Sequence, residues 1–524
     1  IWKTNQIFLV EVPTEGGELS EGVIGTPRFI NPLLATSDTD RDLTTLIYSG
    51  LSRVDKKGNI IPDLAEKYEI SQDGLSYTFK LKENLSWQDG EKITADDILF
   101  TIKTAQDPNL KSPRRASWEG VTVEKIDEKT VRFLLKASYA SFLENTTLGI
   151  IPKHLWKNTS IESFPLSEHN LTSVGSGPYK ISHIEKNPSG VPLYYELAPF
   201  KKFALGAPKI KKLLIYFYPS EDHLLKAYKQ GKIESMNAIS TENAVELKEK
   251  GKRVEKSLMP LPRVFAVFFN QNHKELFSDQ TVRKALDLAL DKELLINEAL
   301  KGYAATLDGP IPPGSLGYLK MTGDEVASTT RAEEARKLLA KAGWKWNASK
   351  KVLEKNAPSA NPKKGSSPKN KIEARELAFS LVTSDTPELA KAAESIKRAW
   401  ENIGAKVELK ILEIGDLNQN IIRPRKYDAL FFGEIIGRDP DPFSFWHSSQ
   451  RNDPGLNVAL YANIKVDKTL ESARALLDKK ERAQKYEEFA KELVKDVPAI
   501  FIYAPYFLYV IPEKIESLEL ESIT

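Results

Sequence analysis

Three carboxylates cluster in the stretch GEIIGRDPDPFSFWHSS, which begins at Gly433 and follows an apolar run typical of a buried strand. They are Glu434, Asp439 and Asp441. A carboxylate paired with a buried ammonium group forms a charge-assisted hydrogen bond of roughly 1.5–3 kcal/mol, so one of these side chains could orient a cationic ligand. The alternative is that Asp-Pro-Asp-Pro forms a rigid turn whose aspartates accept hydrogen bonds from backbone amides. The sequence leaves both interpretations open.

Five further side chains are candidates for ligand contact, and each has a structural alternative. Arg438 could bind a carboxylate through two parallel hydrogen bonds or bridge to an acid of another domain. Trp446 could form a wall against an apolar group or pack in the core, and Asn270 in FFNQ could touch a ligand or hold the backbone beside a buried strand. Arg114 and Trp118, in the segment SPRRASW, could reach a ligand, although charged side chains on a loop are mostly solvated.

The sequence contains no recognisable catalytic or metal-binding motif. Its six histidines are scattered, cysteine is absent, and neither HExxH nor GxSxG occurs. The segment VGSGPY has a Gly-Ser-Gly run, but without GxGxxG or GKS/T it predicts a tight turn rather than a phosphate site. We therefore predict a protein that is not an enzyme and uses no cofactor. A secreted hydrolase, the alternative, would need a nucleophile–base or metal constellation.

The length and composition of the sequence indicate a folded protein with two or three lobes. The 524 residues are 41% hydrophobic and 28% charged, values of a globular protein that exceeds a single core. Lys and Arg number 75 against 72 Asp and Glu, so no basic surplus exists to follow a phosphate backbone, and we predict no nucleic-acid partner. No run of about 18 apolar residues occurs. From the start at Ile1 we expect a processed or truncated form without its export segment or anchor, the alternative being a cytoplasmic N-terminus.

The stretch FKLKENLSWQDGEKITADDILFTI, residues 79–102, predicts a strand, a tight turn and a helix in immediate succession. Asp89-Gly90 supplies the turn, because glycine accepts a positive φ without steric cost. Thr94 is a good N-cap, and Asp96 and Asp97 fall in the first helical turn, where the helix dipole favours negative charge. We therefore interpret the two aspartates as helix-start residues rather than as a metal or acid–base pair.

The character of the chain changes along its length. The first third reads as short strands and turns, whereas later segments alternate buried strands with amphipathic helices, the pattern of an α/β domain. One of these, SDQTVRKALDLALDKELLINEAL, predicts a helix with Ser278 and Asp279 as capping candidates. Residues 356–373, NAPSANPKKGSSPKNKIE, contain almost nothing apolar and predict a solvated loop or a disordered insert.

Several segments together resemble the extracytoplasmic solute-binding proteins of ABC importers, in particular the peptide/nickel-type family 5. The resemblance rests on DLAEKYEISQDGLSYTFKLKENLSWQDGEKITADDILFTI, on VGSGPYKI, on FFN with VRKALDLALDKELLI, and on AGW, IGAKVELK and YDALFFGEIIGRDPDPFSFW in this order. It covers nearly the whole chain.

The resemblance implies a two-lobed mixed α/β fold of the periplasmic-binding-protein type II kind, with a hinge between the lobes and an extra β-rich domain. Domain I would comprise residues 1–46, 169–268 and 488–524, domain II the β-rich insert 47–168, and domain III the α/β lobe 269–487. Trp87 and its QDG turn then look like a structural corner of domain II.

The resemblance also implies a monomeric protein that captures a peptide-like ligand outside the cytoplasm, in the periplasm or on the outer face of the membrane. It would deliver the ligand to the permease subunits of an ABC importer. The loop after the strand that ends near Gly433 would face the ligand, as would the loop that carries Arg114 and Trp118. Other solutes are alternatives: a nickel chelate contacted through His447, haem, or an oligosaccharide.

Peptide-binding relatives often hold the ligand's amino terminus with an aspartate in that loop. Here Gly437 occupies the place of this aspartate, and Glu434 stands where many relatives have tryptophan. Asp439 or Asp441 could supply the carboxylate from a shifted position.

Overall fold

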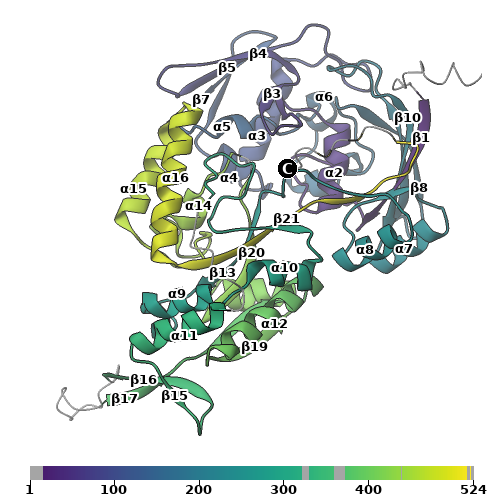
Figure 1. Cartoon of the computed structure of the whole chain (residues 1–524). Coiled ribbons are helices and arrows are strands. Elements are labelled where there is room, and N and C mark those ends of the chain that lie inside the picture. The colour runs from purple at the N-terminus through teal and green to yellow at the C-terminus, as the bar shows by residue number, and fades with distance from the viewer. Residues whose placement is uncertain are drawn as a thin grey trace, which may run out of the picture. The chain divides into compact units, whose positions relative to one another are not determined.

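The computed structural model describes residues 16–320, 330–358, 372–437, 439–515, 518 and 520, which form two compact units (Figure 1). Unit 1 comprises Ile1–Ile239, Leu247–Glu255 and Leu508–Leu518, and unit 2 comprises Ser240–Glu246, Lys256–Phe507 and Glu519–Thr524. Each unit is thus assembled from separate stretches of the chain. The division into domains I, II and III stays a prediction.

Unit 1 contains a seven-stranded mixed sheet. Its central strand β1 pairs in parallel with β10 and β11, while β9 and β8 extend the sheet in antiparallel order. The strand order is β12 (Val254–Lys256), β22 (Leu508–Val510), β11 (Ser235–Met236), β1 (Gly16–Ile24), β10 (Ile210–Tyr218), β9 (Pro192–Pro199) and β8 (Tyr179–Lys186). Its helices include α2 (Asp38–Ile47) and α7 (Glu221–Lys229).

A separate antiparallel sheet of unit 1 contains the strand of the 79–102 stretch. Its order is β4 (Ala65–Ile70), β5 (Ser76–Leu81), β7 (Thr130–Leu134) and β6 (Thr122–Lys125). Helix α3 (Ala95–Gln106) follows β5 and begins with a capping box, in which the Asp97 carboxylate accepts from the Thr94 backbone N–H at 2.9 Å. Asp96 pairs with Lys125 at 3.0 Å. The prediction that both aspartates are helix-start residues is therefore confirmed.

The QDG corner holds the glycine-rich segment VGSGPY in place. The Gln88 side chain donates to the carbonyls of Tyr179 (2.7 Å) and Ile47 (3.2 Å) and accepts from the Gly175 N–H (3.0 Å). At Gly175 a Cβ would lie 2.0 Å from the Ile47 carbonyl oxygen, so only glycine fits. Trp87 beside it is fully buried. The Gly-Ser-Gly run is accordingly a close backbone crossing, and the corner is structural, as predicted.

Unit 2 is built on a six-stranded mixed sheet covered by helices on both faces. The order is β14 (Ala304–Thr306), β21 (Ala499–Pro505), β13 (Arg263–Phe269), β20 (Ala429–Ile435), β18 (Ala378–Ser384) and β19 (Lys406–Leu412). β13 runs antiparallel to β20 and β21, whereas β18 runs parallel to both β19 and β20. This is the mixed α/β architecture that the sequence predicts.

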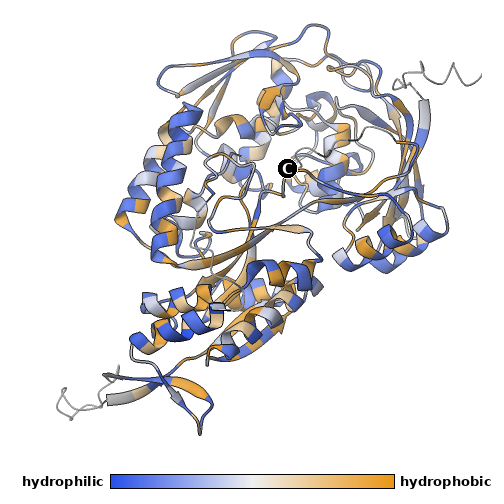
Figure 2. Ribbon diagram, viewed as in Figure 1, coloured by the Kyte–Doolittle hydropathy of each residue, from blue (hydrophilic) through white to orange (hydrophobic). Residues whose placement is uncertain are grey.

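Alternate residues of the buried strand β13 pack into two separate hydrophobic cores, one on each face of the sheet. Val267 and Phe269 face a core formed with α9 (Gln280–Leu288), α10 (Lys292–Leu300), α11 (Arg331–Lys341) and α12 (Pro387–Asn402). Val264, Ala266 and Phe268 face a second core formed with α14 (Phe443–Trp446), α15 (Ile464–Ala475) and α16 (Lys479–Asp496). Figure 2 shows hydrophobic and hydrophilic residues alternating along these helices, as expected for elements with one buried face.

The predicted helix after Ser278 is two helices. Asp279 caps α9 by accepting from the Thr281 N–H at 2.9 Å, as predicted. Asp291 then caps α10 by accepting from the Leu294 N–H at 2.9 Å. The second cap lets the chain turn between α9 and α10 so that both bury apolar residues in the same core.

The predicted solvated segment 356–373 overlaps a β-hairpin. β16 (Val352–Pro358) pairs antiparallel with β17 (Ile372–Glu376), with Pro358 opposite Ile372, and β15 (Lys345–Asn347) extends this small sheet. The loop prediction is thus wrong for 356–358 and 372–373, because backbone pairing extends the strands beyond the apolar residues. Residues 359–371 lie outside the described residues.

Candidate functional site

The carboxyl ends of the parallel strands of unit 2 meet at a topological switch point. From β18 the chain leaves into α12 on one face of the sheet, and from β20 it leaves into the α14 segment on the opposite face. Ligands of open α/β sheets bind where such connections diverge, because the two loops leave a crevice beyond the strand ends. Glu434 near the end of β20 and Ser384 at the end of β18 lie at this edge.

Glu434 is a buried carboxyl group at this edge. It lies opposite Val264 of β13, on the sheet face that carries the α14–α16 core. The residue is 7% exposed, and its Oε1 finds no hydrogen-bond partner within the described part of the chain. Burial raises the pKa of the Glu434 carboxyl well above its ordinary value, because a desolvated carboxylate is disfavoured relative to the neutral acid.

The two aspartates of the DPDP segment form ion pairs with helices of the same unit. Asp439 accepts from Arg482 of α16 at 2.6 Å, and Arg482 is only 2% exposed. Asp441 accepts from Arg474 of α15 through both carboxylate oxygens, with Nε 3.1 Å from Oδ1 and 3.0 Å from Oδ2. The Arg474 guanidinium also lies 4.0 Å above the ring of Phe443. These contacts fix the loop after β20 and give both aspartates a partner inside unit 2.

His447 belongs to the same packed segment. Its ring stacks on Phe443 with centroids 4.0 Å apart, and its Nδ1 lies 2.7 Å from the Ser449 hydroxyl. Its other nitrogen, Nε2, lies 3.4 Å from a carboxylate oxygen of Glu471. Nowhere in the described ranges do three or more His, Asp or Glu side chains gather in an arrangement that could hold a metal ion.

Trp446 packs in the protein core, and Asn270 forms hydrogen bonds to the backbone. Trp446 is 2% exposed and packs against Phe268 and Phe501 in the α14–α16 core. Asn270, also buried, donates from Nδ2 to the Arg425 carbonyl at 2.9 Å and accepts from the His273 N–H at 2.9 Å. It therefore supports the backbone after β13, one of the two roles that the sequence allows.

The candidates of the SPRRASW segment belong to unit 1. Trp118 is fully buried and packs against Phe133 and Phe142, with ring centroids 5.6 and 5.7 Å away. Arg114 is exposed at the start of the short helix α4 (Arg115–Trp118). Arg438 lies outside the described residues. For these three positions ligand contact stays a prediction.

Sequence reasoning missed an aromatic pair on the other face of β20. A Cβ at Gly433 would lie 2.6 Å from the ring of Phe265, which stacks on Tyr503 with centroids 4.7 Å apart. Phe265 is half-buried at the same edge of the sheet. Gly433 inside the predicted strand could have indicated this contact, because a glycine within a strand often marks a place where another group packs closely against the backbone.

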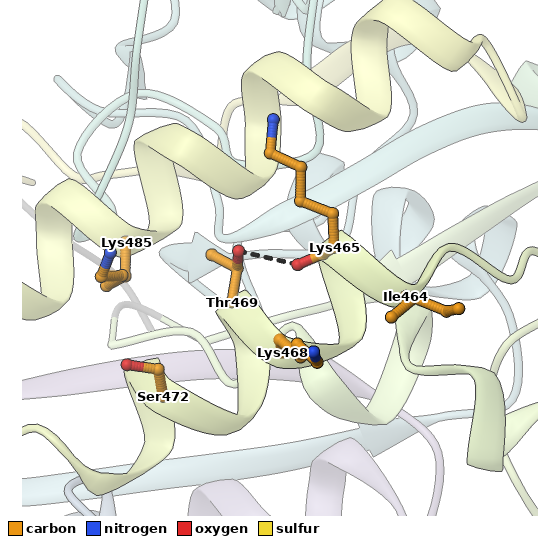
Figure 3. Close-up of a pocket in the computed structure, with 6 residues that line it drawn as sticks. All are labelled: Ile464, Lys465, Lys468, Thr469, Ser472 and Lys485. Carbon is orange, nitrogen blue, oxygen red and sulfur yellow. Dashed lines mark hydrogen bonds between the residues drawn. The ribbon is translucent and has the colours of Figure 1, made fainter.

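One pocket of unit 2 is lined by residues of α15 and α16 (Figure 3). This open pocket of about 540 Å³ is lined by lysines 465, 468 and 485 together with Ile464, Thr469 and Ser472. Lys465 pairs with Glu492 at 2.7 Å and Lys485 with Glu488 at 2.8 Å, both on α16. It contains no buried polar group, so the strand edge is the stronger candidate site.

None of the helices in the described ranges is long and apolar enough to cross a membrane. This agrees with the absence of a long apolar run in the sequence.

Comparison with known proteins identifies the family. Residues 59–456 match the family described as bacterial extracellular solute-binding proteins, family 5 Middle. Oligopeptide-binding protein AppA of Bacillus subtilis is 28% identical over 512 residues, which cover 96% of this chain and 89% of the relative. The dipeptide-binding protein of Escherichia coli is 24% identical over 506 residues, which cover 91% and 87%.

Solved structures agree with this fold over nearly the whole chain. The structure of AppA from Bacillus subtilis in complex with a nonapeptide has a TM-score of 0.72 and 27% identity and covers 97% of both chains. NikZ from Campylobacter jejuni in complex with Ni(L-His) has a TM-score of 0.74 and 26% identity and covers 97% of this chain and 96% of that chain. The mixed α/β fold of the periplasmic-binding-protein kind and the family that the sequence predicts are thus confirmed, whereas the hinge stays a prediction. The chain belongs to family 5 of the bacterial extracellular solute-binding proteins.

Proposed function

We propose that this protein captures a peptide-like solute outside the cytoplasm and delivers it to the permease of an ABC importer. The observation that carries the proposal is the match to an oligopeptide-binding protein along nearly the whole chain, including a structure with a bound nonapeptide. Backbone hydrogen bonds to an extended peptide would give affinity with little side-chain selectivity, because every peptide presents the same amides.

Within unit 2 we place the ligand at the carboxyl ends of β18 and β20. Glu434 is the polar group that faces it in this proposal. Asp439 and Asp441 hold the loop, since their ion pairs with Arg482 and Arg474 already engage both carboxylates.

A nickel chelate is less well supported than a peptide. The sequence offers only His447 for metal contact near this loop, and in the structure this residue is 8% exposed and its ring stacks on Phe443. The proposal also holds that the protein does not turn its ligand over.

Native mass spectrometry of the purified protein tests the proposal, because a binding protein of this kind can retain its ligand through purification. We expect an adduct mass that tandem spectra resolve into peptides. Calorimetric titration with a library of di- to nonapeptides, with Ni(L-His) as a competitor, should then give saturable binding of intact peptides. Binding of the nickel complex alone, or cleavage of the peptides, would overturn the proposal.

A further inference from the structure

A loop of unit 1 carries a high concentration of positive charge. Residues 197–220 contain five lysines and no Asp or Glu, although the whole chain has 75 Lys and Arg against 72 Asp and Glu. Four of the five are exposed and lie in the loop between β9 and β10 or at the start of β10: Lys201, Lys202, Lys209 and Lys211. Residues 200–211 are called the lysine loop below.

The sheet brings the two ends of the lysine loop together. β9 and β10 are antiparallel neighbours, so the chain leaves the sheet and re-enters it at adjacent positions. The Phe200 N–H donates to the Pro178 carbonyl at 2.8 Å. At the other end, the Gly16 N–H of β1, which lies beside β10 (Figure 1), donates to the Lys209 carbonyl at 2.9 Å. The loop is therefore fixed at both ends, and its two pairs of lysines share one end of the sheet.

The four exposed lysines have no carboxylate partner among the described residues. The fifth, Lys212, lies 3.4 Å from Glu18 and 3.1 Å from Glu196 and so engages the acids of the two neighbouring strands. Lys82 brings a further positive charge to the loop, because its Nζ donates to the Ala204 carbonyl at 3.5 Å. The lysine loop therefore presents positive charge to solvent without a local counter-charge.

Apolar side chains lie between the two pairs of lysines. Leu205 is 36% exposed, and Phe203 is half-buried. The chain turns directly after them, since Gly206 has a φ of +95° and its N–H donates to the Phe203 carbonyl at 3.0 Å. Lysines on both sides of an exposed apolar group suit the surface of an anionic bilayer, where phosphate groups lie just outside the hydrocarbon.

The residue types favour lipid over a protein or a small anion. Protein interfaces are rich in Arg, Trp and Tyr and poor in Lys, whereas the lysine loop has four exposed lysines and no arginine, tryptophan or tyrosine. A small anionic ligand would be enclosed in a pocket with a few convergent polar groups, and these lysines are exposed. A broad anionic surface is the partner that matches them.

We propose that the lysine loop docks unit 1 on an anionic phospholipid surface. The lysines contact lipid phosphates, and Leu205 enters the interfacial layer. Each lysine held near an anionic bilayer strengthens adsorption by roughly fivefold, so four of them give reversible binding that salt weakens. The inference goes beyond the proposed function, because it concerns the surface on which the protein works and not the solute that it binds.

Sedimentation of the purified full chain with lipid vesicles tests the inference. One set of vesicles is phosphatidylcholine alone, and the other contains about 40 mol% phosphatidylglycerol. At low salt we expect binding to the anionic vesicles to be at least about tenfold tighter than to the neutral ones. Sodium chloride at about 0.5 M should release the protein, since it screens exposed charges. Inorganic phosphate should compete no better than sodium chloride of equal ionic strength, because the loop binds a surface rather than a single anion.

Two matched variants separate the lysine loop from the overall charge of the protein. Each replaces four exposed lysines without an ion-pair partner among the described residues by glutamine, so both lose the same net charge. The loop variant changes Lys201, Lys202, Lys209 and Lys211, and the control variant changes Lys341, Lys345, Lys351 and Lys406 of unit 2. The loop variant should bind anionic vesicles at least about tenfold more weakly, and the control variant should stay within about threefold of the wild-type protein. Both should keep the wild-type thermal midpoint, because the replaced side chains are exposed.

Several results would overturn lipid docking by this loop. They are equal binding to neutral and anionic vesicles, binding to neither, and an equal loss of binding in both variants. Polyglutamate that binds the wild-type protein as tightly as the anionic vesicles do would assign the loop to an acidic protein partner instead. Each of these results leaves peptide binding, and with it the proposed function, untouched.

Discussion

Arg482 of α16 donates from Nη2 to the Oδ2 of Asp439 at 2.6 Å, and the two residues are 43 positions apart in the sequence. The arginine is 2% exposed, and its Nη1 donates to the Leu476 carbonyl at 2.8 Å. The pair connects the loop after β20 to the long helix α16. This loop continues from the strand that carries Glu434, so the pair helps to position the candidate site.

We expect Asp439→Asn to lower the free energy of unfolding by about 3 kcal/mol, because the change leaves a buried arginine without its counter-charge. Asp441→Asn should cost less, about 1–2 kcal/mol, since Arg474 is 34% exposed and can regain water. Urea denaturation of both variants measures this. If Asp439→Asn keeps full stability but weakens peptide binding, the aspartate is a ligand contact, the first alternative from the sequence.

The Gln88 side chain should be a major contributor to the stability of unit 1. Gln88→Ala removes its bonds to Tyr179, Ile47 and Gly175 and leaves the buried Gly175 N–H without this acceptor, for an expected loss of about 2–3 kcal/mol. Gln230→Ala, an exposed position of the same unit, is the control and should change stability by less than about 0.5 kcal/mol. Equal unfolding curves for the two variants would show that the corner is not needed.

The insert between β16 and β17 should be dispensable for both stability and binding. Pro358 and Ile372 are opposite each other, so replacing residues 359–371 with Asn-Gly would close the hairpin with a two-residue turn. We expect the thermal midpoint and the peptide affinity to stay unchanged. A larger deletion, 356–373, should lower the midpoint because it also removes paired strand residues. A stability loss above about 2 kcal/mol in the shorter deletion would assign residues 359–371 a structural role.

Glu21 on β1 should make unit 1 less stable as the pH rises. Burial raises its pKa to about 7, although the Tyr509 hydroxyl donates to its carboxylate at 2.8 Å. The folded state therefore keeps a proton that the unfolded chain loses above its ordinary pKa of 4.5. The free energy of unfolding should fall between pH 4.5 and 7, by up to about 1.4 kcal/mol per pH unit.

Unfolding of Glu21→Gln across this pH range checks the assignment. The variant should show a flatter profile than the wild-type protein, while Glu18→Gln, at an exposed position on the same strand, should keep the wild-type slope. Identical slopes in all three proteins would remove Glu21 as the cause.

The sequence alone determined the family, the α/β class of unit 2 and the local starts of helices. Thr94 with Asp97 and Asp279 with Thr281 are bonds between residues two or three positions apart, so the chain carries both partners within one turn. The structural role of the QDG corner was also predicted. The hydrogen bonds from Gln88 to the glycine-rich segment VGSGPY were not predicted. The break between α9 and α10 was missed, because the helical periodicity continues across Asp291.

Only the tertiary structure decided what each carboxylate of GEIIGRDPDPFSFWHSS does. Asp439 and Asp441 are paired because α15 and α16, more than 30 positions later, bring Arg474 and Arg482 to them. Glu434 lies opposite Val264 of β13 on the face of the α14–α16 core, and its Oε1 has no hydrogen-bond partner in the part of the chain that the structure describes. The charge state of a side chain depends on its burial and on groups distant in the sequence. The 17-residue stretch with its three acidic residues does not contain that information.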